Sequence, residues 1–366
     1  MNRLRMAVVG VGHLGQSHAR ILAGLPDVEL VGVVDVNAKQ AREIAERCGT
    51  KAYSDVKPLL KRVDAVTVVT PTIYHHAVAK QFLKHGVPVL VEKPIAVTVA
   101  EADELIELAH KANVPLQVGH IERFNPAFEE LVGRPMQPKF IESERHGQFT
   151  GRSTDIGAVL DLMIHDLDLL LSLVGSPVEQ IDALGSAVFG GYEDVVNARL
   201  LFANGCVAHV TASRVSQHNK RRLRVWAPEG YAGIDFVKKQ LILVQPSEKL
   251  RKRGLQTAHL DAAGKVALKD EIFGKHLESL ELDCSNRGDQ LTSELKHFIQ
   301  CVRSGRRPRV TGEDGREALA LAQRILQAIA QHSWNGSNDP KAMGVPGFPA
   351  PLGSLFTTEV ERREAA

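Results

Sequence analysis

The sequence has few cysteines and no long apolar run, and each shortage excludes a class of protein. Its four cysteines, Cys48, Cys206, Cys284 and Cys301, form no CxxC pair and no Cys/His cluster with zinc-finger spacing. We therefore predict no metal site, and thiols that stay reduced in a cytoplasmic protein. No stretch approaches the roughly 20 apolar residues that a membrane-spanning helix needs. The short apolar N-terminus has no small-residue cleavage site, so we interpret it as a buried first strand.

The sequence also has no marked excess of charge of either sign. The 366 residues contain 45 Lys and Arg against 43 Asp and Glu, for a net charge of +2. This balance disfavours a nucleic-acid scaffold. A local basic run at residues 220–224 is compatible either with a phosphate contact or with a solvated strand face. With 44% hydrophobic residues, the composition is that of a globular protein with two or three domains.

The first third of the chain alternates short β-branched runs with helical patterns. Strands are predicted at residues 6–10, 28–35, 65–70, 87–92 and 115–119, and helices at 16–25, 38–48, 75–85 and 99–112. Such alternation indicates an α/β fold with a doubly wound parallel sheet, covered by helices on both faces.

The pattern changes after about residue 122. Strands are predicted at 139–146, 178–189, 195–202, 207–215, 222–227 and 240–244, and helices at 155–173, 291–304 and 315–331. Consecutive strands separated by turns favour a largely antiparallel sheet. We predict a dinucleotide-binding domain over residues 1–121 and a second α/β domain over 122–334, whose C-terminal helices pack back. A Gly/Pro-rich tail follows at 335–366.

A glycine-rich turn identifies the predicted cofactor site. Residues 10–15 read Gly-Val-Gly-His-Leu-Gly, a GxGxxG pattern that follows a strand and opens a helix. Gly10 permits the turn, Gly12 the approach of a pyrophosphate, and Gly15 close packing of helix and strand; His13 and Leu14 complete the loop. Asp35, at the end of the second strand, stands where an acidic residue binds the adenosine ribose and disfavours a 2′-phosphate. The predicted cofactor is therefore NAD.

Further candidates follow the next two strands, whose carboxyl ends share one edge of the sheet. Thr70 and Pro71 end one strand, and His75 follows as either a cofactor contact or a surface residue, as does His76. Glu92 and Lys93 end the next strand, where Pro94 keeps Lys93 extended. We expect the Lys93 ammonium to point at a substrate hydroxyl.

The predicted acid–base pair lies on a later helix. Asp161 and His165 are four residues apart and share one helical face in apolar surroundings. Hydride leaves a carbinol carbon only as the hydroxyl proton is removed. We assign His165 as the base, Lys93 as its electrostatic and proton-sharing partner, and Asp161 as the group that orients His165.

Taken together, these motifs resemble the Gfo/Idh/MocA oxidoreductase family over nearly the whole chain up to about residue 331. The match rests on the glycine loop, Thr70-Pro71 with His75, Glu92-Lys93-Pro94, Arg123-Phe124, and the helix from Asp161 to Asp168. The resemblance implies a Rossmann domain, a second domain with an open and mostly antiparallel sheet, and Lys93, Asp161 and His165 as the catalytic group. It also implies a homodimer or homotetramer formed through that sheet. Thr72 and Met163 depart from the family pattern, which has Asn and Gly there.

One stretch points to a narrower substrate. Gly119 and the segment Arg123-Phe124-Asn125-Pro126 are similar to a stretch in family members that resemble UDP-N-acetylglucosamine 3-dehydrogenases. Such members oxidise the sugar 3-hydroxyl to a ketone, in routes to diamino sugars for lipid A or related glycans. This implies substrate contacts from Arg123 and Asn125, although a domain linker in which Arg123 pairs with a carboxylate explains the stretch equally well.

Two other functions remain open. One is a dehydrogenase of a free sugar or cyclitol such as inositol or glucose. The other is a non-catalytic regulator that senses the cofactor, which would need no joint presence of Lys93, Asp161 and His165. That joint presence favours an enzyme.

Overall fold

The computed structural model describes residues 3–149, 156–188, 192–255, 257 and 260–332. The described residues form two compact units, one of residues 3–124 with 288–321 and one of the described residues from 125 to 287 with 322–332. The first boundary falls three residues after the predicted one. Residues 288–321, part of the C-terminal helices predicted to pack back, are grouped with the first unit. The predicted tail at 335–366 lies outside the described residues.

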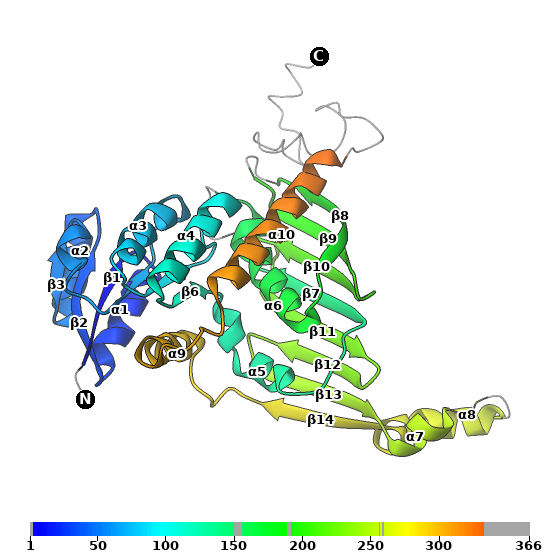
Figure 1. Ribbon diagram of the computed structural model, residues 1–366. Helices are drawn as coiled ribbons and strands as arrows, with labels where there is room; N and C mark the ends of the chain where they lie inside the picture. The colour runs from blue at the N-terminus through cyan, green and yellow to red at the C-terminus, as the bar shows by residue number, and fades with distance from the viewer. Residues whose placement is uncertain (1–2, 150–155, 189–191, 256, 258–259, 333–366) are drawn as a thin grey trace, which may run out of the picture. The chain divides into compact units, whose positions relative to one another are not determined.

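The first unit contains a parallel six-stranded sheet of order β3-β2-β1-β4-β5-β6 (Figure 1). Its strands are β1 (Leu4–Val9), β2 (Val28–Val34), β3 (Lys51–Tyr53), β4 (Ala65–Val68), β5 (Val89–Glu92) and β6 (Leu116–Gly119). Its helices are α1 (Gly15–Gly24), α2 (Ala38–Cys48), α3 (Thr72–Lys84), α4 (Val99–Ala112) and α9 (Gln290–Ser304). Strand order reverses between β1 and β4, which creates the crevice where such sheets bind ligands.

The core of this unit forms because its central strands are apolar on both faces. Met6 and Val8 of β1 pack with Leu22 of α1, and with Leu295 and Phe298 of α9. The helices α1, α2 and α9 thus bury one side of the sheet, while α3 and α4 pack together on the other (Figure 1). Each helix begins and ends at identifiable signals. In α4, Thr98 and Glu101 form a capping box at the start, and Asn113 in the left-handed region ends the helix.

The second unit contains an eight-stranded sheet of order β14-β13-β12-β11-β7-β10-β9-β8. Only β7 and β10 pair in parallel; the other neighbours are antiparallel, as predicted. The strands are β7 (Phe140–His146), β8 (Val178–Ser186), β9 (Val195–Phe202), β10 (Val207–Ser213), β11 (Lys220–Ala227), β12 (Gly230–Asp235), β13 (Gln240–Pro246) and β14 (Leu277–Asp283). The edge strand β14 carries Glu278, Glu281 and Asp283 and is mostly exposed.

Several elements of the second unit were not predicted. They are β12, β14, α5 (Pro126–Val132), α7 (Glu248–Arg253) and α8 (Ala262–Glu271). The helices α7 and α8 bury no residue, so no amphipathic pattern marks them. The strand β12 contains Gly230 and Gly233, which weaken a strand pattern. The helix predicted at 155–173 is observed as a π-helical turn η3 (Val159–Met163) followed by α6 (Ile164–Val174). The strand predicted at 178–189 ends at Ser186.

The helix α10 (Gly312–Gln331) carries residues of both units. In the second unit, its Arg324 donates to the carbonyl groups of Val178 and Glu179 at the start of β8. Among the described residues, no helix is long and apolar enough to cross a membrane.

We predict that Gly15→Ala destabilises the first unit by about 3 kcal/mol, at the upper end of the range for overpacked cores. A Cβ at Gly15 would lie 1.8 Å from the carbonyl oxygen of Gly10, which is backbone and cannot rotate away. Gly24→Ala is the matched control in the same helix, because a Cβ there meets nothing within 4 Å. Urea denaturation followed by circular dichroism measures both changes; equal stabilities would contradict the packing argument.

Candidate active site

The glycine loop between β1 and α1 has the shape of a phosphate cradle. Gly10 has φ +86°, and a Cβ there would lie 2.5 Å from the Val69 carbonyl oxygen, so only glycine fits. A Cβ at Gly12 would meet nothing, so the backbone is open to a ligand at that point. No side chain caps α1 at Leu14, and its first turn holds no acidic residue. The positive end of the α1 dipole is therefore available to an anion.

Asp35 directly follows β2 and is tied to this loop. One carboxylate oxygen accepts from the backbone N–H of Val11 at 2.9 Å, and the other accepts from that of Asn37 at 2.9 Å. Gln40 adds a hydrogen bond from its amide to the Val11 carbonyl at 3.0 Å. Because a carboxylate oxygen accepts more than one hydrogen bond, Asp35 retains acceptor capacity for a ribose diol.

His75 connects the loops that follow β4 and β5. It is 1% exposed; its Nδ1 lies 2.7 Å from the carbonyl oxygen of Pro94, and its Nε2 lies 2.7 Å from that of Thr70. Burial lowers the pKa of the imidazole, against the two carbonyl contacts that raise it. The ring thus fixes Thr70 and Pro94 at the crevice edge. A direct cofactor contact from His75 stays a prediction. Pro71, beside Thr70, is exposed at the start of α3.

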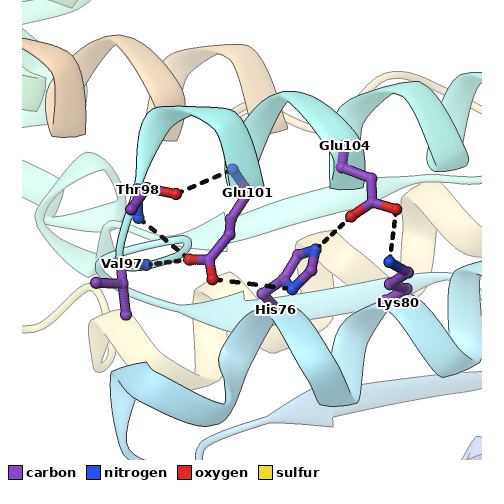
Figure 2. Close-up of polar contacts among 6 residues, drawn as sticks. All are labelled: His76, Lys80, Val97, Thr98, Glu101 and Glu104. Carbon is purple, nitrogen blue, oxygen red and sulfur yellow. Dashed lines mark hydrogen bonds and ion pairs between the residues drawn. The ribbon is translucent and has the colours of Figure 1, made fainter.

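His76, the neighbouring residue that we also considered, belongs to a polar cluster that links α3 to α4 (Figure 2). Its Nε2 lies 2.7 Å from Glu104, and its Nδ1 lies 4.0 Å from Glu101. Lys80 pairs with the same Glu104 at 2.6 Å. These contacts account for His76 as a residue that holds two helices together.

Glu92 points into the fold rather than out of it. Its carboxylate lies 3.1 Å from Nε2 of the buried His18 on α1 and accepts from the backbone N–H of Lys93 at 3.3 Å. Burial opposes ionisation of Glu92, but the hydrogen bond and charge of His18 and the charge of Lys93 hold its pKa below the usual range. A Cβ at Gly119 would lie 2.8 Å from this carboxylate. Glu92 therefore joins α1, β5 and β6 behind the predicted catalytic lysine.

A second buried carboxyl group, missed from the sequence, lies in the same unit. Glu294 of α9 is 0% exposed, and neither carboxyl oxygen has a hydrogen-bond partner among the described residues. Burial and the charge of Glu92 raise its pKa well above the usual value. Folding therefore favours the protonated form of Glu294. No sequence signal marks it, because its neighbourhood is created by segments about 200 residues apart.

In the second unit, Asp161 lies in the π-helical turn η3 and His165 is the second residue of α6. Both are partly exposed, whereas Asp166 and Asp168 are 1% exposed. Single π turns occur often at functional sites. Among the acidic and histidine residues at the described positions 156–173, Asp161 and His165 are thus the ones that remain partly exposed.

Asp166 has a structural partner instead. Arg145 of β7 donates through Nε and Nη2 to the Asp166 carboxylate at 2.7 and 3.1 Å, and Ser143 donates to it at 2.9 Å. Arg145 and Asp166 are both almost fully buried. This pair attaches the helix that carries His165 to the middle of the sheet.

The predicted substrate residues have different surroundings. The side chain of Arg123 is 10% exposed and lies 3.8 Å from Asp314. Asn125 is 0% exposed; its Oδ1 accepts from the Ala127 N–H and its amide donates to the Phe236 carbonyl. The Asn125 side chain thus caps the start of α5 and contacts the backbone just after β12, and a substrate contact from it stays a prediction. The role of Arg123 stays a prediction.

The basic run of β11 is paired with carboxylates on the neighbouring strands. Lys220 lies 2.8 Å from Glu144, and Arg224 lies 2.8 Å from Glu142, both on β7. Arg222 lies 3.6 Å from Asp235 on β12. These pairs favour the interpretation of the run as a strand face over a phosphate site.

Within the first unit, the structure brings together the glycine loop, Asp35, and the loops of Thr70 and Pro94. The catalytic candidates are divided, since Lys93 belongs to the first unit and Asp161 and His165 to the second. Their joint action remains a prediction. No group of three or more metal-ligating side chains occurs in the described ranges.

Comparisons with known proteins match both units. A model described as an oxidoreductase family with an NAD-binding Rossmann fold matches residues 4–120, and the GFO/IDH/MocA C-terminal domain matches residues 130–232. A UDP-N-acetylglucosamine 3-dehydrogenase of Acidithiobacillus ferrooxidans is 36% identical over 330 residues, which are 90% of this chain and 98% of that protein. A solved structure of that enzyme gives a TM-score of 0.78 at 34% identity, over 90% of this chain and 98% of that chain. A myo-inositol 2-dehydrogenase of Thermotoga maritima is 28% identical over 90% of this chain and 97% of its own length.

We predict that Glu294→Gln changes how stability depends on pH. Because folding raises the pKa of Glu294, the folded state holds a proton that the unfolded state loses above about pH 4.3. The native protein should therefore lose stability as pH rises above that value, and the variant should lose less. Melting temperatures between pH 4 and 8 measure this. Glu107→Gln, at an exposed position on α4, is the control; identical profiles for native protein and Glu294→Gln would show that Glu294 ionises freely.

Proposed function

We infer that this chain, which belongs to the GFO/IDH/MocA oxidoreductase family, is an NAD-dependent dehydrogenase that removes hydride from a sugar hydroxyl. Its first unit carries the NAD-binding Rossmann domain of that family. The observation that carries the proposal is the combination of an open phosphate cradle at Gly12 with Lys93, whose backbone is held by Glu92. A regulator that only senses the cofactor has no need of such a lysine.

For the substrate, we propose the 3-hydroxyl of a nucleotide-activated amino sugar similar to UDP-N-acetylglucosamine. The support is the 36% identity to a UDP-N-acetylglucosamine 3-dehydrogenase, which extends over 98% of that protein. The product would be a 3-ketone, suited to amination on the way to lipid A or a related glycan. A free cyclitol is the alternative, because an inositol dehydrogenase matches over nearly the same length at 28% identity.

Each residue then has a chemical task. The N-terminus of α1 and the backbone at Gly12 would hold the pyrophosphate, and Asp35 the adenosine ribose. NAD, when bound, supplies the hydride acceptor. His165 accepts the hydroxyl proton, Asp161 orients the imidazole, and the Lys93 ammonium stabilises the developing negative charge on the sugar oxygen.

The assembly and the compartment belong to the same proposal. On the second unit, Phe140, Trp226 and Tyr231 form an aromatic row across three adjacent strands, with ring centroids 5.1 and 5.2 Å apart. Such a partly exposed aromatic row suits the interface of a homodimer or homotetramer. The four thiols are free, which suits the reducing cytoplasm.

We predict that the purified protein reduces NAD in the presence of UDP-N-acetylglucosamine. Absorbance at the NADH band measures the reaction, with myo-inositol and glucose in parallel reactions. Turnover of inositol or glucose alone would overturn the substrate assignment. Binding of NAD without turnover of any of these substrates would favour the regulator.

We predict that Lys93→Ala lowers kcat by about 10³-fold, within the range for loss of a positioned proton-sharing group. Affinity for NAD, measured by calorimetry, should stay within about threefold, because the phosphate cradle and Asp35 are unchanged. Lys84→Ala, on the exposed end of α3, is the matched control and should behave as native protein. Near-native turnover of Lys93→Ala would show that the lysine has no catalytic role.

A further inference from the structure

The first N–H groups of the helical segment that carries Asp161 bind to one residue that is distant in the sequence. Glu193 lies in the connection between β8 and β9, and its carboxylate accepts from the backbone N–H of Val159 at 3.0 Å. The carbonyl oxygen of the same Glu193 accepts from the N–H of Ala158 at 2.9 Å. The side chain of Ala158 itself cannot cap the turn. Two of the N–H groups that a helix start leaves unpaired are thus satisfied by one residue.

The contact between Glu193 and the start of the helical segment is buried and closely packed against Gly157. Glu193 is 1% exposed. A Cβ on Gly157 would lie 2.0 Å from the Glu193 carboxylate, so the glutamate side chain occupies the space where any larger residue 157 would project. The carbonyl of Gly157 in turn accepts from the N–H of Asp161 at 3.0 Å. Glu193 thus binds the backbone of residues 158 and 159, and the adjacent Gly157 binds the backbone of Asp161. A displacement of Glu193 would therefore also displace Asp161.

Glu193 is in turn fastened to the sheet. The neighbouring Asp194 donates its N–H to Ser186 at the end of β8 at 2.8 Å, and its carbonyl accepts from the N–H of Arg214 at 2.9 Å. The guanidinium of Arg214 donates to the Asp194 carboxylate at 2.5 Å and to the carbonyl of Ile156 at 2.7 Å. Glu193 and Arg214, which the sheet positions, thus both bind the backbone at the start of the helical segment.

We propose that Glu193, supported by Asp194 and Arg214, is a positioning residue that fixes the π-helical turn and thereby the orientation of Asp161 and His165. The proposal rests on the proposed function, in which these two residues perform the proton transfer. Neither the glycine loop nor Lys93 takes part in it.

Charge on Glu193 is not what the position requires. Burial raises the pKa of its carboxyl group, against the Val159 hydrogen bond and the charge of Arg214, which lower it. Its second oxygen has no hydrogen-bond partner among the described residues. An acceptor oxygen at the place of Oε1 is sufficient, and a glutamine amide provides one.

The first test compares Glu193→Ala with Glu193→Gln. Glu193→Ala should lower kcat about 10–100-fold, because small misplacements of reacting groups cost that much, while the KM for NAD stays within about twofold. Glu193→Gln should restore kcat to within about threefold of native. If Glu193→Ala fails to fold, Glu193→Asp, which withdraws the carboxyl by one methylene, takes its place. Native kcat in the shortened variant, or a loss in Glu193→Gln equal to that in Glu193→Ala, would overturn the proposal.

The second test does not depend on the reaction. Hydrogen exchange of the amides at residues 158–166 should accelerate at least tenfold in Glu193→Ala and stay native in Glu193→Gln, with peptides of the first unit unchanged. Gly157→Ala should strongly lower the free energy of unfolding in the native background. The loss should be smaller in the Glu193→Ala background, where the space next to residue 157 is vacated. Unchanged exchange in Glu193→Ala would overturn the positioning role. Accelerated exchange in a protein that turns over no sugar would support the role and reject the proposed function instead.

Discussion

The hydrogen bond between His18 and Glu92 is the contact on which the first unit's chemistry depends. It joins the helix that follows the glycine loop to the last residue of β5, directly before Lys93, so one side chain connects the cofactor cradle to the lysine. A charged carboxylate in this position is tolerated because His18 and Lys93 offset its burial. The neighbouring Glu294 has no hydrogen-bond partner among the described residues, and burial with the charge of Glu92 raises its pKa well above the usual value. The pKa values of two glutamates in one core are thus shifted in opposite directions, because His18 and Lys93 lower one whereas burial dominates at the other.

In the second unit, too, buried polar contacts hold the element that carries the predicted catalytic residues. The helical segment of Asp161 and His165 is attached to its sheet by buried polar pairs rather than by apolar packing alone. Arg145 holds Asp166 from β7, and Glu193 holds the start of the π turn. Buried polar contacts of this kind are directional, so they fix the rotation of a helix about its axis more firmly than apolar contacts do. The predicted proton transfer by Asp161 and His165 would need such a fixed orientation.

The first unit was predicted well from the sequence because its signals are local. Glycine spacing, β-branched strands and the stops at Pro71 and Gly49 each act over a few residues, and the helix predicted at 38–48 is observed with those bounds. The contacts that hold the predicted catalytic groups were not predictable in this way. Glu193 meets Val159 across 34 residues, and Glu294 comes within reach of Glu92 only when α9 folds back onto the parallel sheet. The hydrogen bond from the Asn125 amide to the carbonyl of Phe236, 111 residues away, also has no local sequence signal.

The acidic edge strand β14 of the second sheet affects how readily two copies of the protein could pair edge to edge. The strand β14 leaves one row of backbone hydrogen-bonding groups at the end of an eight-stranded sheet, the geometry from which uncontrolled polymerisation begins. Glu278, Glu281 and Asp283 place negative charges along that row, so two such edges repel each other at neutral pH. Like charges along an edge strand are one of the devices by which proteins disfavour edge-to-edge pairing of sheets.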